Sequence, residues 1–212
     1  MSTFLERYPE IAPDLKRIRE IILENIDNSG PTLRGPLTEL ASHGGKMLRP
    51  AFLVLFAGFG QKRGDNIYHL AASVEMLHMA TLIHDDVIDE AGLRRGNPSL
   101  NAKYGNRLAV LMGDYLFSRC FVLASRYASP QNSPLLAHAV ARICESEIAQ
   151  ASQIYNSNVT KRDYLRRISG KTTALFLLSC HTGATESRAA SWITALARSA
   201  GYCIGSAFQI ID

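Results

Sequence analysis

The chain contains few cysteines, and their spacing excludes a CxxC metal or redox motif. Its 212 residues include four cysteines, each within an apolar pattern typical of a helix. They are Cys120, Cys144, Cys180 and Cys203. We therefore expect buried, reduced thiols and a cytoplasmic protein.

A signal peptide and a membrane span are also missing from the pattern. Residues 1–7 are too polar for a signal peptide. The longest apolar runs are too short to cross a bilayer, or they contain Asp114 and Arg119. We expect no transmembrane segment.

No concentrated basic surface accompanies the formal net charge of +4. Lysines and arginines are dispersed along the chain, and the densest group, 162–167, alternates with apolar residues at helical spacing. Such a group is typical of a solvated helix face, so we expect no nucleic-acid partner.

Strand alternation, internal repeats and low-complexity segments are absent, whereas 47% of the residues are hydrophobic. This content suffices for one substantial core. Helical periodicity is found near 10–28, 32–42, 50–59, 66–89, 106–127, 134–154, 161–179 and 187–212, with breaks at 60–64, 92–98, 129–134 and 181–187. We expect one all-α domain over residues 1–212, with an amphipathic helix at 66–89.

The most informative segment is an acidic cluster at the end of the helix predicted for 66–89. Asp85, Asp86 and Asp89 lie within five positions, and Asp85 and Asp89 share one helix face. Close carboxylates repel one another unless a cation lies between them. Mg2+ suits this cluster because it takes oxygen ligands and binds substrate phosphates at the same time. For the motif alone, a solvated acidic helix end is the alternative.

Basic residues suited to phosphate flank the acids. Lys46 and Arg49 stand three residues apart before an apolar run, where a helix start would offer free N–H groups. Arg94 and Arg95 follow the acids, and guanidinium groups bind phosphate oxygens bidentately. Lys171 adds a third basic point before another apolar run.

Five segments occur in a fixed order: GGKMLRP, EMLHMATLIHDDVIDEAGLRRG, GDYLFS, SGKTTALF and FQIID. Together they resemble the trans-isoprenyl diphosphate synthases, also called polyprenyl synthetases, from about residue 10 to the end. The two residues between Asp86 and Asp89 resemble the long-chain and geranylgeranyl-type members. The resemblance implies an isoprenoid-synthase-type helical bundle around a central cavity, with Mg2+ as cofactor.

The resemblance also implies a role for each matching residue. The Mg2+ ligands would be Asp85 and Asp89, supported by Asp86, together with Asp212 at the start of a second Asp-rich motif. The isopentenyl diphosphate pocket would use Lys46, Arg49, His78 and Arg95. The allylic diphosphate would contact Arg94, Lys171, Thr172 and Gln209. Asp85, Asp89, Arg94 and Lys171 would assist catalysis directly.

The implied reaction is a head-to-tail condensation. The allylic diphosphate leaves as an allylic cation forms, and the isopentenyl double bond then attacks that cation. Metal ions and basic side chains stabilise the charge that develops on the leaving oxygens. Apolar walls would exclude water, and the released diphosphate would accept the proton.

Two histidines leave alternatives open. His78 precedes Asp85 by seven residues and lies close to the same face, where a buried structural histidine is the alternative to a phosphate ligand. His84 forms an HD pair with Asp85, as in metal-dependent phosphohydrolases. The further ligands of that class are not found at the required spacings.

Product length is argued from the same helix. Ala80 and Thr81 lie about one turn before Asp85 and are small, so a prenyl tail could pass this level and stop near Leu77 or Val74. We expect a product of C20 or longer. Such a product would also permit peripheral contact with a membrane.

The segment 108–123 is apolar nearly all round, so it is either central to the core or half of an oligomer interface. The resemblance favours a homodimer, or a heterodimer with a different subunit. Asp114 lies in this segment, where we expect it to be buried beside a basic partner in a structural role.

The final predicted helix lacks a closing signal, and the resemblance implies that the family fold continues beyond Asp212. Two hypotheses remain open. The chain is part of a prenyl-elongating transferase, or it is a non-catalytic partner that binds a diphosphate or an inactive, truncated form. A class I terpene cyclase would share DDxxD but lack the Gly-Gly-Lys and Arg-Arg-Gly elements.

Overall fold

The computed structural model describes residues 8–42, 45–61, 64–94, 96–152, 160, 170 and 172–211. These residues form two compact units, Met1–Pro50 with Tyr68–Arg126 and Ala51–Ile67 with Tyr127–Asp212. Each unit is considered by itself, and the single domain predicted over 1–212 stays a prediction. The predicted all-α class is confirmed, because the described elements are helices except for one short hairpin.

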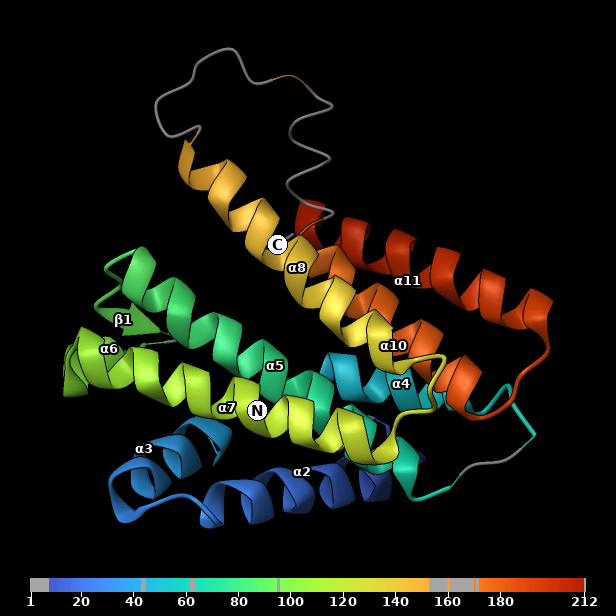
Figure 1. Ribbon diagram of the computed structural model, residues 1–212, viewed down its shortest axis with the longest axis horizontal. Coiled ribbons are helices and arrows are strands. Elements are labelled where there is room, and N and C mark those ends of the chain that lie inside the picture. The colour runs from blue at the N-terminus through green and yellow to red at the C-terminus, as the bar shows by residue number, and fades with distance from the viewer. Residues whose placement is uncertain are drawn as a thin grey trace. The chain divides into compact units, whose positions relative to one another are not determined.

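The first unit contains most of the helix that carries the acids (Figure 1). The elements are α2 (Ala12–Asp27), α3 (Pro31–Ser42), α5 (Asn66–Ile88), β1 (Leu93–Arg94), β2 (Asn97–Pro98), α6 (Leu100–Tyr104) and α7 (Asn106–Tyr127). The two strands pair antiparallel, with Leu93 opposite Pro98 and Arg94 opposite Asn97. Only a turn was expected in this segment.

Helix α5 is buried all round rather than amphipathic. Every residue from 70 to 77 is buried, so this stretch of the helix has no solvent-facing side. The Ser73 hydroxyl donates to the Cys120 carbonyl of α7 at 3.1 Å, which joins the two helices inside the core. Helix α2 covers α7, where the Tyr115 hydroxyl donates to the Asn25 carbonyl at 2.9 Å.

Helix α7 is neither fully central nor fully exposed. One face is buried through Met112, Leu116 and other residues, whereas Leu111 is 52% exposed and Phe121 is 42% exposed. The expected burial of Asp114 is wrong, since its side chain is 59% exposed. Among the described residues, α7 alone is long and apolar enough to cross a membrane, a criterion that core helices also meet.

The second unit contains α4 (Leu48–Ala57) for the most part, together with α8 (Ser133–Ser152), α10 (Thr172–Glu186) and α11 (Ser191–Ile211). Helix α10 contacts both α8 and α11 (Figure 1). Phe176 of α10 is fully buried, with its ring centroid 5.5 Å from those of Phe52 and Phe208.

Two glycines of α11 allow it to approach the α10 backbone closely. A Cβ on Gly201 would lie 2.7 Å from the Leu177 Cα atom, and one on Gly205 would lie 2.6 Å from the Thr173 Cα atom. Side chains at these positions would therefore push the helices apart.

The break predicted at 181–187 is wrong for 181–186, which continue α10. Gly183 serves packing here, because a Cβ on it would lie 2.2 Å from the Leu53 carbonyl oxygen of α4. The helix ends before a turn in which Arg188 has a φ of 60°. Predicted helical residues 161–169 lie outside the described residues.

The cysteine prediction is half right. Cys120 and Cys180 are buried, but Cys144 and Cys203 are exposed, and all four are free thiols. Cys144 and Cys203 lie on solvent-facing positions of α8 and α11. An apolar sequence pattern fixes the helix, but it does not fix which face is covered.

Candidate diphosphate-binding site

The acids lie where α5 ends, as the sequence predicts. The Asp89 N–H donates to the Asp85 carbonyl at 2.8 Å, so the helical turn extends through Asp89. Asp85 and Asp86 are both 7% exposed, whereas Asp89 is exposed. The shared face of Asp85 and Asp89 thus joins a buried carboxylate to one that faces solvent.

The helix closes with a Schellman motif formed without glycine. The Ala91 N–H donates to the Asp86 carbonyl and the Glu90 N–H donates to the Val87 carbonyl, at 2.9 and 3.4 Å. Glu90 occupies the left-handed position, with a φ of 50°. This closure turns the chain toward β1 directly after the acids.

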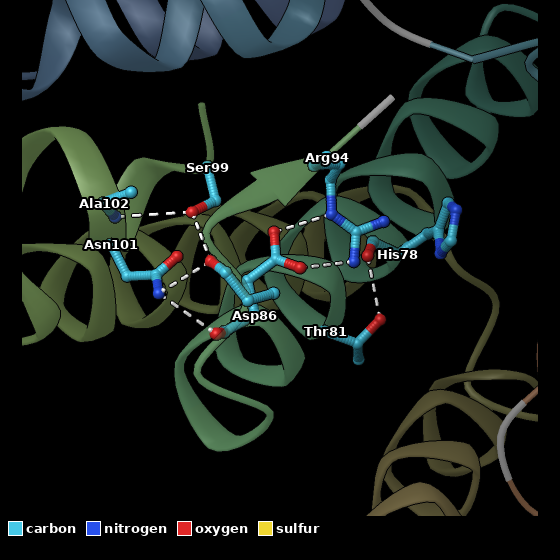
Figure 2. A network of polar contacts seen from close by, with 8 residues as sticks. His78, Thr81, Asp86, Arg94, Ser99, Asn101 and Ala102 are labelled. Carbon is cyan, nitrogen blue, oxygen red and sulfur yellow. Dashed lines mark hydrogen bonds and ion pairs between the residues drawn. The ribbon is translucent and has the colours of Figure 1, made fainter. Parts of the chain in front are cut away.

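The β1–β2 hairpin then places Arg94 on Asp86. The Arg94 Nε donates to the Asp86 Oδ2 at 2.6 Å, and the Arg94 Nη2 donates to the Asp86 Oδ1 at 2.7 Å (Figure 2). The Asp86 side chain is 9% exposed and that of Arg94 is 29% exposed. Figure 2 shows the guanidinium facing the carboxylate edge to edge.

The acids stabilise the charged form of Arg94. The hydrogen bond to Asp86 is the largest effect and raises the pKa of Arg94; burial is the next largest and lowers it, and the negative charges of Asp86, Asp85 and Asp89 raise it further. All three acids of the cluster therefore act on one guanidinium.

Two polar residues that the sequence analysis missed hold this corner together. The Asn101 Nδ2 donates to the carbonyls of Asp86 and Ala91, each at 3.1 Å, and the Ser99 hydroxyl donates to the Ala91 carbonyl at 2.6 Å. Ser99 also caps α6 by accepting from the Ala102 N–H at 3.3 Å. The cap signal was present, since Ser99 and Gly105 bracket the short helix.

His84 points toward α7 rather than joining a metal cluster. Its Nε2 atom lies 3.2 Å from the Val110 carbonyl oxygen and 3.4 Å from the Asp114 Oδ1. Its ring stacks on Phe117, with centroids 5.5 Å apart. A Cβ on Gly113 would lie 2.2 Å from the ring, so this glycine makes room for the histidine.

Three residues predicted for the isopentenyl pocket lie in the same unit as the acids. Lys46 is exposed, whereas Arg49 and His78 are half-buried. The His78 carbonyl accepts a hydrogen bond from the Thr81 hydroxyl at 2.8 Å, and its ring points away from the Asp86–Arg94 pair in Figure 2. Their shared pocket stays a prediction.

In the second unit, the structure brings together two residues predicted to contact the allylic diphosphate. The buried Thr172 hydroxyl of α10 donates to the Gln209 Oε1 of α11 at 2.5 Å. Arg95, Lys171 and Asp212 were also predicted for the site, and they lie outside the described residues.

The donor set fits Mg2+ by its chemistry. Asp85, Asp86 and Asp89 offer only carboxylate oxygens, the ligands that Mg2+ prefers. Within the described part of the chain, no three His, Cys, Asp or Glu side chains lie close enough to hold a metal by themselves.

Known proteins resemble this chain in sequence. The polyprenyl synthetase family model matches residues 30–212. The chain is 38% identical over 209 residues to heptaprenyl diphosphate synthase component 2 of Geobacillus stearothermophilus, covering 97% of this chain and 64% of that relative.

Solved structures give the same result. A decaprenyl diphosphate synthase from Rhodobacter capsulatus superposes with a TM-score of 0.92 at 36% identity, over 99% of this chain and 64% of that one. A polyprenyl synthase from Caulobacter crescentus, complexed with calcium and isoprenyl diphosphate, gives 0.90 at 32% identity, over 97% and 62%. The chain thus spans just under two thirds of the length of these relatives. With its motifs, its all-α fold and these matches, the chain belongs to the polyprenyl synthetase family.

Proposed function

We propose that this protein is a prenyltransferase that condenses isopentenyl diphosphate head-to-tail with an allylic diphosphate. The single observation that carries the proposal is the corner at the end of α5. There, Asp85 and Asp86 are buried beside the charged Arg94, and Asp89 follows one turn later. Such a corner provides oxygen ligands and a cation at one place.

The residues of the chain divide the work of binding. Asp85 and Asp89 would hold Mg2+, which supplies positive charge to the leaving diphosphate when it is bound. Arg94 donates hydrogen bonds to the same diphosphate. In the second unit, Thr172 and Gln209 remain predicted contacts of an allylic diphosphate. Lys46, Arg49 and His78 bind the second diphosphate and orient the isopentenyl double bond.

Buried apolar side chains of α5 would exclude water from the reaction. Ala80 and Leu77 are fully buried there and offer no polar side-chain atom to the allylic cation. Preorganised charges act more strongly in such an apolar environment than they do in water.

A product of C20 or longer is supported by the small side chain of Ala80 and by the relatives. Relatives that match this chain at 38, 37 and 32% identity are named heptaprenyl, nonaprenyl and octaprenyl diphosphate synthases. One matching structure was solved with calcium and isoprenyl diphosphate, which supports a divalent metal and this substrate class.

The test is to incubate the chain with labelled isopentenyl diphosphate, an allylic starter and Mg2+, and to separate the products by length. We expect prenyl chains of C20 or longer from the wild type. Ala80→Phe should give shorter products, because the phenylalanine ring would block the path of the prenyl tail about one helical turn before Asp85. Asp85→Asn serves as the inactive control. Failure to bind either substrate would contradict the proposal.

A second candidate is a diphosphate-binding partner subunit. Two relatives, at 38 and 36% identity, are named component 2 of heptaprenyl diphosphate synthase. This role predicts that the chain binds pyrophosphate with Mg2+ but forms no product alone. Turnover by the purified chain would exclude it.

A further inference from the structure

We infer that Met47 is a positioning residue, whose buried side chain holds the backbone that directs Lys46 toward isopentenyl diphosphate. The inference deepens the proposed function and rests on it, because Lys46 and Arg49 are assigned there to the second diphosphate. Met47 lies between these two cations in the sequence and carries no charge itself. Its task is to fix a left-handed backbone conformation.

Left-handed backbone is uncommon outside glycine, and three of the described non-glycine residues adopt it. They are Met47, Glu90 and Arg188, with φ of 47, 50 and 60°. The last two follow α5 and α10, where hydrogen bonds of the Schellman type hold the turn, such as that from the Ala189 N–H to the Ala184 carbonyl at 3.0 Å. Met47 instead precedes a helix, since α4 begins at Leu48. A helix closure therefore does not account for its conformation.

Burial distinguishes Met47 from the other two residues. Met47 is only 6% exposed, whereas Glu90 and Arg188 are exposed. Its Sδ atom lies 4.0 Å from the Nη2 atom of Arg19 of α2, in the same unit. A flexible thioether side chain fills such a buried gap well. Strained backbone persists where surrounding contacts fix it, so we assign the φ of 47° to the burial of this side chain.

The φ angle of Met47 sets where Lys46 lies relative to α4. A rotation about the N–Cα bond of Met47 swings Lys46, but it leaves Arg49 in place as a residue of α4. Lys46 is exposed, and a lysine side chain is flexible. A fixed backbone beneath it reduces the conformational freedom that is lost when a ligand binds. Met47 thereby preorganises the two cations for one diphosphate.

Two isomeric substitutions test the inference. Met47→Leu and Met47→Ile both keep an apolar side chain, but the β-branch of isoleucine makes a left-handed conformation far less accessible. We expect Met47→Leu to bind isopentenyl diphosphate within about twofold of wild type. Met47→Ile should bind it about tenfold more weakly, the effect of losing one charge-assisted hydrogen bond. Calorimetric titration in EDTA measures the affinity without a contribution from metal.

A double variant shows whether Met47 acts through Lys46. We expect Lys46→Ala to weaken the binding of isopentenyl diphosphate about tenfold. Adding Met47→Ile to Lys46→Ala should change the affinity by less than about twofold, because the cation that the backbone directs is then absent. A merely structural role of Met47 would give the same fold-loss in both backgrounds.

Met112 of α7 is the matched control, because it is fully buried in the same unit. Met112→Leu and Met112→Ile should both bind within about twofold of wild type. Thermal melting of every variant shows whether it folds. Met47→Gly replaces Met47→Ile if the latter does not fold. It accepts the left-handed conformation but lacks the buried side chain that fixes it, so it should also bind about tenfold more weakly.

The outcomes distinguish the inference from the proposed function. A wild-type chain that does not bind isopentenyl diphosphate would overturn both. Binding that Lys46→Ala weakens, but that is equal in Met47→Leu and Met47→Ile, would overturn the inference alone. An equal loss in Met112→Ile, or an undiminished loss from Met47→Ile in the Lys46→Ala background, would overturn it as well.

Discussion

The Cys120 thiol of α7 is fully buried beside the Ser73 hydroxyl of α5. Burial raises the pKa of Cys120 to about 12, against an ordinary value of 9.0. The folded protein therefore keeps this thiol protonated at a pH where the unfolded chain loses the proton.

This pKa difference predicts a pH dependence of stability. The contribution of Cys120 is present in full below pH 9 and is lost as the pH rises toward 12. In the wild type, this thiol should lower the free energy of unfolding by about 1.4 kcal/mol for each pH unit between pH 9 and 11. Cys120→Ala lacks this contribution, so its free energy of unfolding should fall less steeply with pH. Urea unfolding at several pH values measures the free energy of unfolding. Equal slopes against pH in the wild type and in Cys120→Ala would show that the thiol is accessible to solvent.

The residue types of the site could be predicted, but their pairing could not. The order of acids and arginines in the sequence predicts a diphosphate site, and the structure places Arg94 on Asp86, next to the buried Asp85. Which acid holds Arg94 depends on the hairpin and on Asn101, whose contacts join segments through tertiary structure. No local pattern contains that information.

At the scale of elements, periodicity predicts most helices because it records their buried faces. Helices α2, α3, α5 and α7 begin and end within two residues of the ranges expected from the sequence. Helix α6 was not predicted because its five residues are too few to show a period. Helix α10 extends further than predicted because Gly183 is a packing contact rather than a break.

At the scale of elements, the close contact at Gly183 predicts how a substitution there affects stability. A methyl group there meets the Leu53 carbonyl oxygen at 2.2 Å, so Gly183→Ala should destabilise the protein by about 1 to 3 kcal/mol. Gly35 of α3 is the matched control, because nothing lies within 4 Å of its added Cβ. Gly35→Ala should stabilise by up to about 1 kcal/mol, through helix propensity.

Chemical unfolding of the two glycine variants beside wild type makes the comparison. Equal stability of Gly183→Ala and Gly35→Ala would mean that α4 and α10 do not pack as closely as described. A loss confined to Gly183→Ala would locate the constraint at the contact between these helices.

At the scale of the whole molecule, the exposed apolar residues of α7 suggest self-association. Leu111 and Phe121 are 52 and 42% exposed, and large apolar side chains are enriched at subunit contacts. We expect sedimentation to give twice the subunit mass of 23.3 kDa. Leu111→Glu should shift the particle toward the monomer.

Leu196 of α11 provides the comparison, since it is 59% exposed and lies in the other unit. Leu196→Glu should leave the sedimenting mass unchanged. A monomeric wild-type chain at about 100 μM, ten to a hundred times a micromolar Kd, would contradict the predicted dimer.

The glycines that bring α11 onto α10 restrict how these helices can change. The main chains of α10 and α11 lie so close at Gly201 and Gly205 that a residue with a Cβ would not fit at either position without a shift. A slide of α11 that brought another residue into this contact would therefore be opposed sterically. Thr172 and Gln209 lie on this closely packed pair and are joined by a hydrogen bond, so a ligand that pulls on one of them also acts on the other helix.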